Sequence, residues 1–343
     1  MKERSLSAAL TALAAAASLA FAVNAQDRKL DAKVQLAVGG KSALFYLPLT
    51  VTERLGYFKD EGLDVEISDF QGGAKSLQAL IGGSADVVTG AYDHIVQMHA
   101  KNQPIIGLVE LGRFPGYALG VVTAKAQNYR GAADLKGMKI GITAPGSSTH
   151  FMALHLMAQN GLRADEASFI GVGATSSAVA AVKRGEIDAI VNVDPVISVL
   201  ESQNLVKIVA DTRTLEGTRQ VFGGPYTAAV LYALPAYVEK NTNAVQALVN
   251  AFVRGLRWMQ VHSAEEIAKV MPEEYALGDK TLYLAAIKKS LPMYSSDGRF
   301  GRDGAETAHR VLAAFDPQVK SATIDIAKTY TDAFVDKALA AQH

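Results

Sequence analysis

The turn Ala144–Thr149 carries the residues best suited to binding chemistry in this sequence. Gly146 permits close approach of the backbone to a ligand, and Ser147, Ser148 and Thr149 place hydroxyls at an expected helix start. Free N–H groups at such a start favour an anion by about 0.3 to 1 kcal/mol, and by up to about 2 kcal/mol when partly buried. The turn is therefore a candidate anion cradle, with simple capping of its own helix as the alternative.

Further turns present small polar groups in the same way. A glycine pair offers bare backbone amides, although a flexible turn would have the same composition. A third turn adds a tyrosine ring ahead of Asp93, which we expect to cap a helix. A fourth turn holds an amide and a carboxylate, and helix capping competes for the latter. The candidate ligand contacts in these turns are Gly72, Gly73, Tyr92, Asn192 and Asp194.

The turn Lys41–Tyr46 differs from the others because it is apolar and aromatic. Rings at Phe45, Tyr46 and Tyr92, joined by Tyr226, indicate an organic ligand rather than a bare inorganic ion. The alternative is that Phe45 and Tyr46 only cover the core. Ser42 in the same turn completes the set of candidate contacts.

Catalytic and cofactor motifs are missing or incomplete. The sequence has no G-x-S-x-G, H-E-x-x-H or Walker A motif. Gly171–Ser176 resembles half of a dinucleotide fingerprint, but Ser176 replaces its third glycine. Two histidine pairs are spaced i, i+5, about 140° apart on a helix, which does not suit one metal ion. We therefore predict no catalytic residue, no metal and no cofactor. The rival class is an enzyme on the same scaffold, with His150 as a general base beside Ser147 or Ser148.

The composition excludes several classes of protein. The chain has 343 residues, 34 Lys+Arg against 34 Asp+Glu, and no cysteine. A neutral chain lacks the basic surface that nucleic-acid binding requires. The lack of cysteine excludes thiolate catalysis, disulfides and cysteine-ligated zinc. With 49% hydrophobic and 20% charged residues, the composition is that of a globular protein.

The N-terminus has the pattern of a secretory signal. A short positive start is followed by the apolar, alanine-rich run Leu6–Val23 and by small residues up to Ala25. We predict cleavage after Ala25 and export to the periplasm; an uncleaved membrane anchor is the alternative. The remaining chain exceeds the roughly 250 to 300 residues at which single cores stop growing, so two lobes are expected.

Strand and helix patterns alternate along most of the chain. Short β-branched runs alternate with helical patterns in the first third of the chain, and the same alternation starts again in the second third. Two such units are typical of two doubly wound α/β lobes. In such sheets the turns listed above lie together beyond the carboxyl ends of the strands, where ligands bind. The stretch after Val206–Ala210 is polar, and the last strand is expected over Tyr226–Tyr232. Beyond Pro235 the pattern is helical, with Val245, Leu248, Phe252, Leu256 and Met259 on one face and final helices over 305–315 and 324–339.

Five segments together resemble the periplasmic solute-binding proteins of ABC transporters, in the nitrate, sulfonate and taurine branch that includes thiamine-precursor binders. They are 55–66 (LGYFKDEGLDVE), 70–73 (FQGG), 134–137 (DLKG), 145–148 (PGSS) and 184–189 (RGEIDA). The resemblance covers about residues 33 to 340. The sequence departs from lipid-anchored relatives, because no cysteine follows the signal, and it lacks the cysteine-rich motif of the related eukaryotic pyrimidine synthases.

This resemblance implies a type II periplasmic binding protein, with two lobes joined by two crossing strands near 117–121 and 222–226. One lobe would comprise 26–117 plus 226–343 and the other 118–225, with Gly72 and Gly73 facing Ser147 and Ser148 across the cleft. The implied function is capture of an organic sulfonate or similar small organic acid by a monomer, and delivery to a permease driven by a cytoplasmic ATPase. A thiamine-precursor pyrimidine is the alternative ligand.

Overall fold

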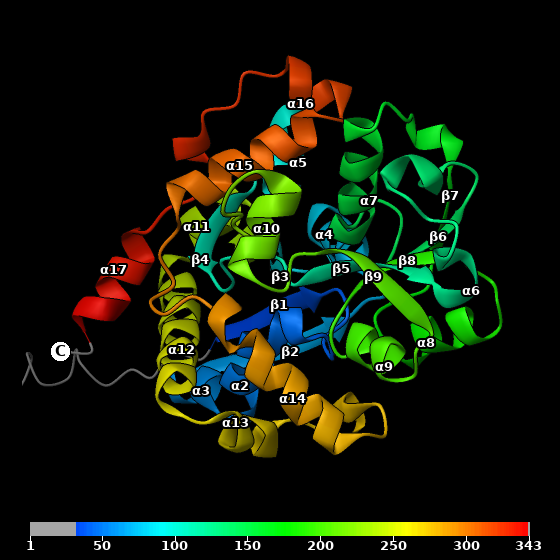
Figure 1. Cartoon of the computed structure of the whole chain (residues 1–343). Helices are drawn as coiled ribbons and strands as arrows, with labels where there is room; N and C mark the ends of the chain where they lie inside the picture. Colours follow the sequence, from blue (N-terminus) through cyan, green and yellow to red (C-terminus); the bar gives the residue numbers. More distant parts are fainter. Residues whose placement is uncertain (1–31, 342–343) are drawn as a thin grey trace, which may run out of the picture.

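A computed structural model describes residues 32–341, which form two sheets of five strands with helices packed around them (Figure 1). The predicted signal segment 1–25 lies outside the described residues. Within 32–341, no helix combines the length and hydropathy needed to cross a bilayer.

The first sheet has the strand order β2-β1-β3-β10-β4. β1 pairs in parallel with β2 and β3, whereas β10 runs antiparallel to β3 and β4. Its strands are β1 (Ala32–Val38), β2 (Leu63–Asp69), β3 (Val87–Ala91), β4 (Ile106–Glu110) and β10 (Ala229–Ala233). The helices between them are α2 (Leu47–Arg54), α3 (Tyr57–Asp60), α4 (Gly73–Ile81) and α5 (Tyr92–Ala100), with the short 3-10 helix η1 (Leu44–Tyr46).

The second sheet repeats this arrangement in the order β7-β6-β8-β5-β9, with β5 antiparallel to both of its neighbours. Its strands are β5 (Tyr117–Val122), β6 (Lys139–Ile142), β7 (Ser168–Gly171), β8 (Ala189–Val193) and β9 (Val206–Asp211). Its helices are α6 (Thr123–Ala126), α7 (Ser148–Gln159), α8 (Ser176–Lys183), α9 (Val196–Ser202) and α10 (Leu215–Phe222), with η2 (Ala132–Leu135) and η3 (Ala164–Glu166).

The chain passes between the two sheets twice. Its first passage follows β4 and its second precedes β10, and the two passages are joined where the Ala228 amide donates to the Gly112 carbonyl (3.0 Å). The lobe boundaries expected from the sequence, between 117 and 118 and between 225 and 226, stay a prediction; Tyr117 already begins β5 of the second sheet. The last strand begins at Ala229, later than the predicted Tyr226, because residues 226–228 belong to the second passage.

The C-terminal third is helical and covers the first sheet (Figure 1). All five residues of the predicted α12 stripe, from Val245 to Met259, are buried. The helices are α11 (Pro235–Lys240), α12 (Thr242–Val261), α13 (Ala264–Val270), α14 (Lys280–Ser290), α15 (Arg302–Ala313), α16 (Pro317–Ser321) and α17 (Ala333–Ala340), with η4 (Glu273–Ala276), η5 (Leu291–Met293) and η6 (Ile326–Lys328).

Two predictions about these elements were wrong. The polar stretch after β9 contains helix α10, which buries Thr218, Val221 and Phe222. The helix expected over 324–339 is interrupted between η6 and α17. There the Gly107 amide donates to the Thr329 carbonyl (2.9 Å), so this segment extends the edge of the first sheet instead of continuing a helix.

Candidate functional site

A small cavity lies between the two sheets. Its walls come from the carboxyl ends of β1, β3, β6 and β8 and from the starts of α4 and α7. Ligands of open α/β sheets bind at this edge. The lining residues are Gly39, Ala43, Phe45, Tyr46, Gly73, Ala91, Tyr117, Thr143, Ser147, Ser148, Thr149, Ala174 and Val193.

Six of the predicted contacts line this cavity: Phe45, Tyr46, Gly73, Ser147, Ser148 and Thr149. Gly72 lies beside them, since a Cβ atom on it would stand 2.9 Å from the Ser147 Oγ atom. The Gly146 carbonyl lies 3.3 Å from the His94 Nε2 atom, also beside the lining residues. The structure thus brings the glycine pair and the serine pair together from opposite sides of the cleft.

Other predicted contacts are engaged elsewhere. The Tyr92 ring packs against Phe300 and its hydroxyl is hydrogen-bonded to Thr329, so this side chain belongs to the core. The Asn192 side chain donates to the Gly173 carbonyl (2.8 Å). Both side chains are hydrogen-bonded within the protein, and neither residue lines the cavity. Ser42 is partly exposed in the turn after β1 and is not among the lining residues.

Asp93 does not cap helix α5, contrary to the sequence-based expectation. Ala91 is the N-cap residue, and Asp93 is fully buried in the first turn. Its Oδ1 atom accepts from the Ser148 hydroxyl (2.8 Å), and its Oδ2 atom accepts from the Tyr226 hydroxyl (3.2 Å). Tyr226 was predicted to touch the ligand, but its hydroxyl is directed to Asp93. Both residues lie directly behind the cavity wall formed by Ser148.

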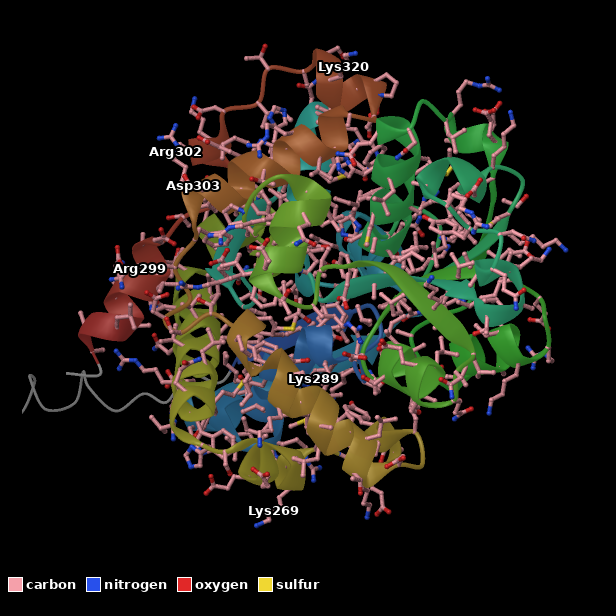
Figure 2. The ribbon with its side chains drawn as sticks, viewed as in Figure 1. Lys269, Lys289, Arg299, Arg302, Asp303 and Lys320 are labelled. Carbon is pink, nitrogen blue, oxygen red and sulfur yellow. The ribbon has the colours of Figure 1, made fainter. Side chains whose placement is uncertain are left out.

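The site contains a buried acid and no formal cation among its lining residues. Burial raises the pKa of Asp93, while the neighbouring His94 and the hydroxyls of Ser148 and Tyr226 act in the opposite direction. Burial lowers the pKa of His94. The lysine and arginine side chains labelled in Figure 2, such as Lys289 and Arg302, are exposed and lie on outer helices and loops. Any charge on a ligand would therefore meet hydroxyls and backbone amides, with the Asp93 carboxyl behind them.

Direct hydrogen bonds join the two sides of the cleft around this cavity. The donors and acceptors come from the turns that the sequence singled out, and the structure is therefore closed. The bonds are Leu44 N to Asp194 O (2.8 Å), Ala74 N to Ser147 Oγ (3.0 Å), Ser148 Oγ to Asp93 Oδ1 (2.8 Å) and Gln71 Nε2 to Gly171 O (3.2 Å).

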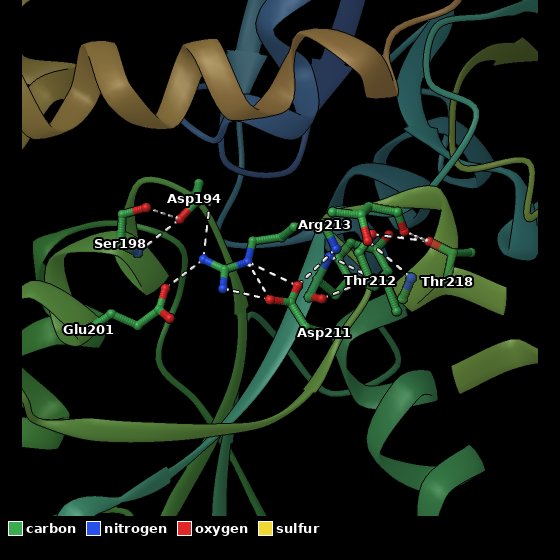
Figure 3. A network of polar contacts seen from close by, with 10 residues as sticks. Asp194, Ser198, Glu201, Asp211, Thr212, Arg213 and Thr218 are labelled. Atoms are coloured by element: carbon green, nitrogen blue, oxygen red, sulfur yellow. Dashed lines mark hydrogen bonds and ion pairs between the residues drawn. The ribbon is translucent and has the colours of Figure 1, made fainter. Parts of the chain in front are cut away.

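The Asp194 side chain is held by a polar network at the rim of the cleft (Figure 3). Its Oδ1 atom accepts from the Ser198 amide (2.8 Å) and hydroxyl (2.7 Å) in the first turn of α9, whose N-cap residue is Pro195. Arg213 lies 3.7 Å from the Oδ2 atom and pairs with Glu201 (2.6 Å) and Asp211 (2.7 Å). Only the backbone carbonyl of Asp194 reaches across the cleft.

His150 is not paired with either serine that the enzyme hypothesis required. Its Nδ1 atom accepts from the Gly146 amide (3.1 Å), and its ring packs edge-on against Phe169, 4.3 Å between centroids. Burial lowers the pKa of His150 to about 4. Within residues 32–341, no group of three or more His, Asp or Glu side chains is arranged to hold a metal ion.

Sequence reasoning missed several lining residues. Gly39, Ala43, Ala91, Thr143, Ala174 and Val193 are small or apolar residues next to turns that were recognised. Tyr117 was assigned only to the passage between lobes, yet its ring stacks on Phe45 (5.5 Å, 26°) and forms part of the cavity wall. Thr143 directly follows strand β6, and this position could have identified it from the sequence.

Two five-stranded α/β lobes closed on a shared cavity define a protein of the periplasmic binding protein fold. The sequence profile of the NMT1/THI5-like family matches residues 46–266, and the chain belongs to this family.

Known proteins of this kind resemble the chain over most of its length. A solved structure from Bordetella bronchiseptica RB50 is 50% identical, has a TM-score of 0.88 and covers 90% of this chain and 98% of its own. The alkanesulfonate-binding protein SsuA from Xanthomonas axonopodis pv. citri, bound to MOPS, is 18% identical with a TM-score of 0.66 and coverages of 88% and 99%. The formylaminopyrimidine-binding protein of Halalkalibacterium halodurans is 24% identical, over 76% of this chain and 78% of its own.

Proposed function

We propose that this protein is the substrate-binding component of an ABC importer, exported to the periplasm as a monomer. It captures a small organic molecule between its lobes and delivers it to a membrane permease with its ATPase. The observation that carries the proposal is the cavity lined by both lobes and ringed by hydrogen bonds between them. A ligand touches both walls only in the closed form, so its differential affinity for that form drives closure.

The first candidate ligand is an organic sulfonate or a similar small organic acid. Helix α7 begins at Ser148, so the amides of Ser148 and Thr149 have no acceptor within the helix and can bind an anionic oxygen. The rings of Phe45, Tyr46 and Tyr117 suit the organic part of such a ligand. The fold shared with an alkanesulfonate-binding protein is consistent with this choice.

The second candidate is a pyrimidine precursor of thiamine. A specific feature favours it: the buried Asp93 carboxylate lies behind Ser148, while no lysine or arginine lines the cavity. A neutral aromatic ring with an amino group would need no cation, and Phe45 and Tyr117 offer an aromatic surface. A relative named as a formylaminopyrimidine-binding protein supports this alternative.

A thermal-shift screen with three ligand classes tests the proposal and separates its two candidates. A ligand at a hundredfold excess over its Kd adds about 2.7 kcal/mol to the free energy of unfolding. Stabilisation by alkanesulfonates or small carboxylates supports the first candidate, whereas stabilisation by a hydroxymethylpyrimidine alone selects the second. If no small organic ligand stabilises the protein and none co-purifies by native mass spectrometry, the binding function is refuted.

Export is tested separately from binding. N-terminal sequencing of the protein recovered from the periplasm should begin at Gln26, directly after the predicted cleavage at Ala25. Recovery of the uncleaved chain in the membrane fraction would contradict the export proposal and leave ligand binding to be judged by the screen.

A further inference from the structure

A continuous chain of hydrogen bonds runs from the cavity wall into the first lobe. Ser148 lines the cavity, and its hydroxyl donates to Asp93 at 2.8 Å. On the far side, Tyr226 also donates to Asp93, at 3.2 Å. Tyr117 and Ser148 line the cavity, whereas Asp93 and Tyr226 lie behind it. Hydroxyl groups from both lobes therefore donate to the Asp93 carboxylate.

The carboxylate fixes the direction of every bond in this chain. An ionised carboxyl group only accepts hydrogen bonds, so the single hydroxyl proton of Ser148 is committed to Asp93. The Ser148 oxygen then has a lone pair, but no free proton, to offer a ligand.

Donor groups lie beside this hydroxyl in the same cavity wall. The Ser147 Oγ atom accepts from the Ala74 amide (3.0 Å), which leaves the Ser147 proton free to donate. The amides of Ser148 and Thr149 at the start of α7 are also donors, because they have no partner within the helix. The wall thus offers an acceptor at the Ser148 hydroxyl and donors next to it, which suit different groups on a ligand.

We propose that Asp93 is a specificity-determining residue that acts through Ser148, and that the ligand carries a hydrogen-bond donor facing the Ser148 hydroxyl. The same ligand presents an acceptor or anionic group to Ser147 and the α7 amides. This inference rests on the proposed binding function and narrows its ligand to molecules with both groups. A ligand with acceptors only would leave the Ser148 oxygen without a donor, which lowers its affinity by about tenfold or more.

The test uses two pairs of probes that differ by one donor group. They are 2-hydroxyethanesulfonate against ethanesulfonate, and 4-amino-2-methylpyrimidine against 2-methylpyrimidine. Calorimetric Kd values are measured at pH 8 to favour the ionised carboxyl. The native protein is expected to prefer the donor-bearing member of the pair it binds by about tenfold or more.

The variant Asp93→Asn should abolish or reverse this preference. An asparagine amide can donate to Ser148, which frees the serine proton to face the ligand. Ser148→Ala removes the acceptor itself by a separate route and should reduce the preference while Asp93 is kept. The matched control is Asp279→Asn, which alters an exposed helix cap on α14 away from the cavity and should leave the preference unchanged.

The outcomes separate this inference from the function on which it rests. A native protein that binds a probe pair without preference, or folded Asp93→Asn and Ser148→Ala variants that keep the native preference, overturns the role of Asp93 alone. A native protein that binds no member of either pair, and no ligand in the thermal-shift screen, overturns the binding function together with this inference. If Asp93→Asn does not fold by circular dichroism, the Ser148→Ala result decides.

Discussion

The backbone amide of Leu44 donates to the backbone carbonyl of Asp194 across the cleft, at 2.8 Å. Ala43 and Phe45, the neighbours of Leu44, both line the cavity, and so does Val193, which precedes Asp194. The bond therefore closes the rim directly beside the ligand space. Its strength depends on how firmly the second lobe holds Asp194 in place.

Arg213 is expected to control that position. It is the cation shared by Asp194, Glu201 and Asp211, and its side chain is only 18% exposed. In Arg213→Gln these carboxylates lose their common partner and repel one another, which should loosen the turn at Asp194. We expect at least tenfold faster hydrogen exchange at the Leu44 amide, measured by NMR on the native fold.

Arg184→Gln is the matched control for Arg213→Gln. It removes an arginine of the same lobe that pairs with Glu186 at the exposed surface, where ion pairs contribute about 0 to 1 kcal/mol. Exchange at Leu44 should not change in this control. Equal exchange rates in native protein and Arg213→Gln would show that the Arg213 network does not hold the rim.

Gly72→Ala should keep the cleft from closing fully. A Cβ atom at this position would stand 2.9 Å from the Ser147 Oγ atom and 3.0 Å from the Ala144 Cβ atom, both in the opposite lobe. The backbone of Gly72 is extended, with φ −172°, so alanine brings no backbone strain. The lobes should separate slightly, giving a larger radius of gyration in X-ray scattering and at least tenfold weaker ligand binding.

The stability of this variant should stay within about 0.5 kcal/mol of the native value, because the clash exists only in the closed form. Gly131→Ala is the control, since nothing lies within 4 Å of its Cβ position. A Gly72→Ala protein that binds its ligand as tightly as the control would show that the two lobes approach less closely than described.

The strand and helix pattern predicted most of the fold because it depends on local periodicity. The stripe from Val245 to Met259 identified α12 from spacing alone, and the turns after β1, β3, β6 and β8 located the site. Helix α10 was missed because Glu216, Arg219 and Gln220 dilute its apolar face. Its boundary signals were present: the Thr214 hydroxyl accepts from the Gly217 amide, and Gly223 ends the helix with φ +76°.

The polar contacts of the site were harder to predict than its position. An aspartate soon after a strand is most often a helix cap. Asp194 accepts from a first-turn amide of α9 although Pro195 is the N-cap residue, and Asp93 does not cap α5. The partners of Asp93 are 55 and 133 residues away in the sequence. Side chains brought together over such separations follow from the packing of two lobes, which no local pattern encodes.

His150 should make the protein sensitive to mild acid. Burial lowers the pKa of its ring to about 4, against 6.5 for the exposed side chain. Between these values the unfolded chain binds a proton that the folded protein excludes, so stability rises with pH through this window and is lost as pH falls. The slope from this one group is at most about 1.4 kcal/mol per pH unit.

His150→Asn should flatten that dependence in urea melts between pH 4 and 7. The asparagine oxygen can still accept from the Gly146 amide, as the Nδ1 atom of His150 does at 3.1 Å. An unchanged slope in the variant would assign the acid sensitivity to other groups. Because the hypothetical general base is removed, the same protein also tests the enzyme hypothesis: ligand binding should persist.

Glu110 should make the folded protein less stable as pH rises, whereas His150 makes it less stable as pH falls. It ends β4 beside the first passage between lobes and is 2% exposed. Burial raises its pKa to about 8 from 4.5, so between these values the folded protein holds a proton that the unfolded chain releases. Stability therefore falls as pH rises from about 5 to 8, by at most about 1.4 kcal/mol per unit. In denaturant melts Glu110→Gln should lose this decline and be more stable than native protein at pH 8.5, whereas the exposed control Glu186→Gln should follow the native profile. If the native and Glu110→Gln profiles remain parallel up to pH 8.5, the carboxyl is already ionised in the folded protein and the passages between lobes are not linked to a proton.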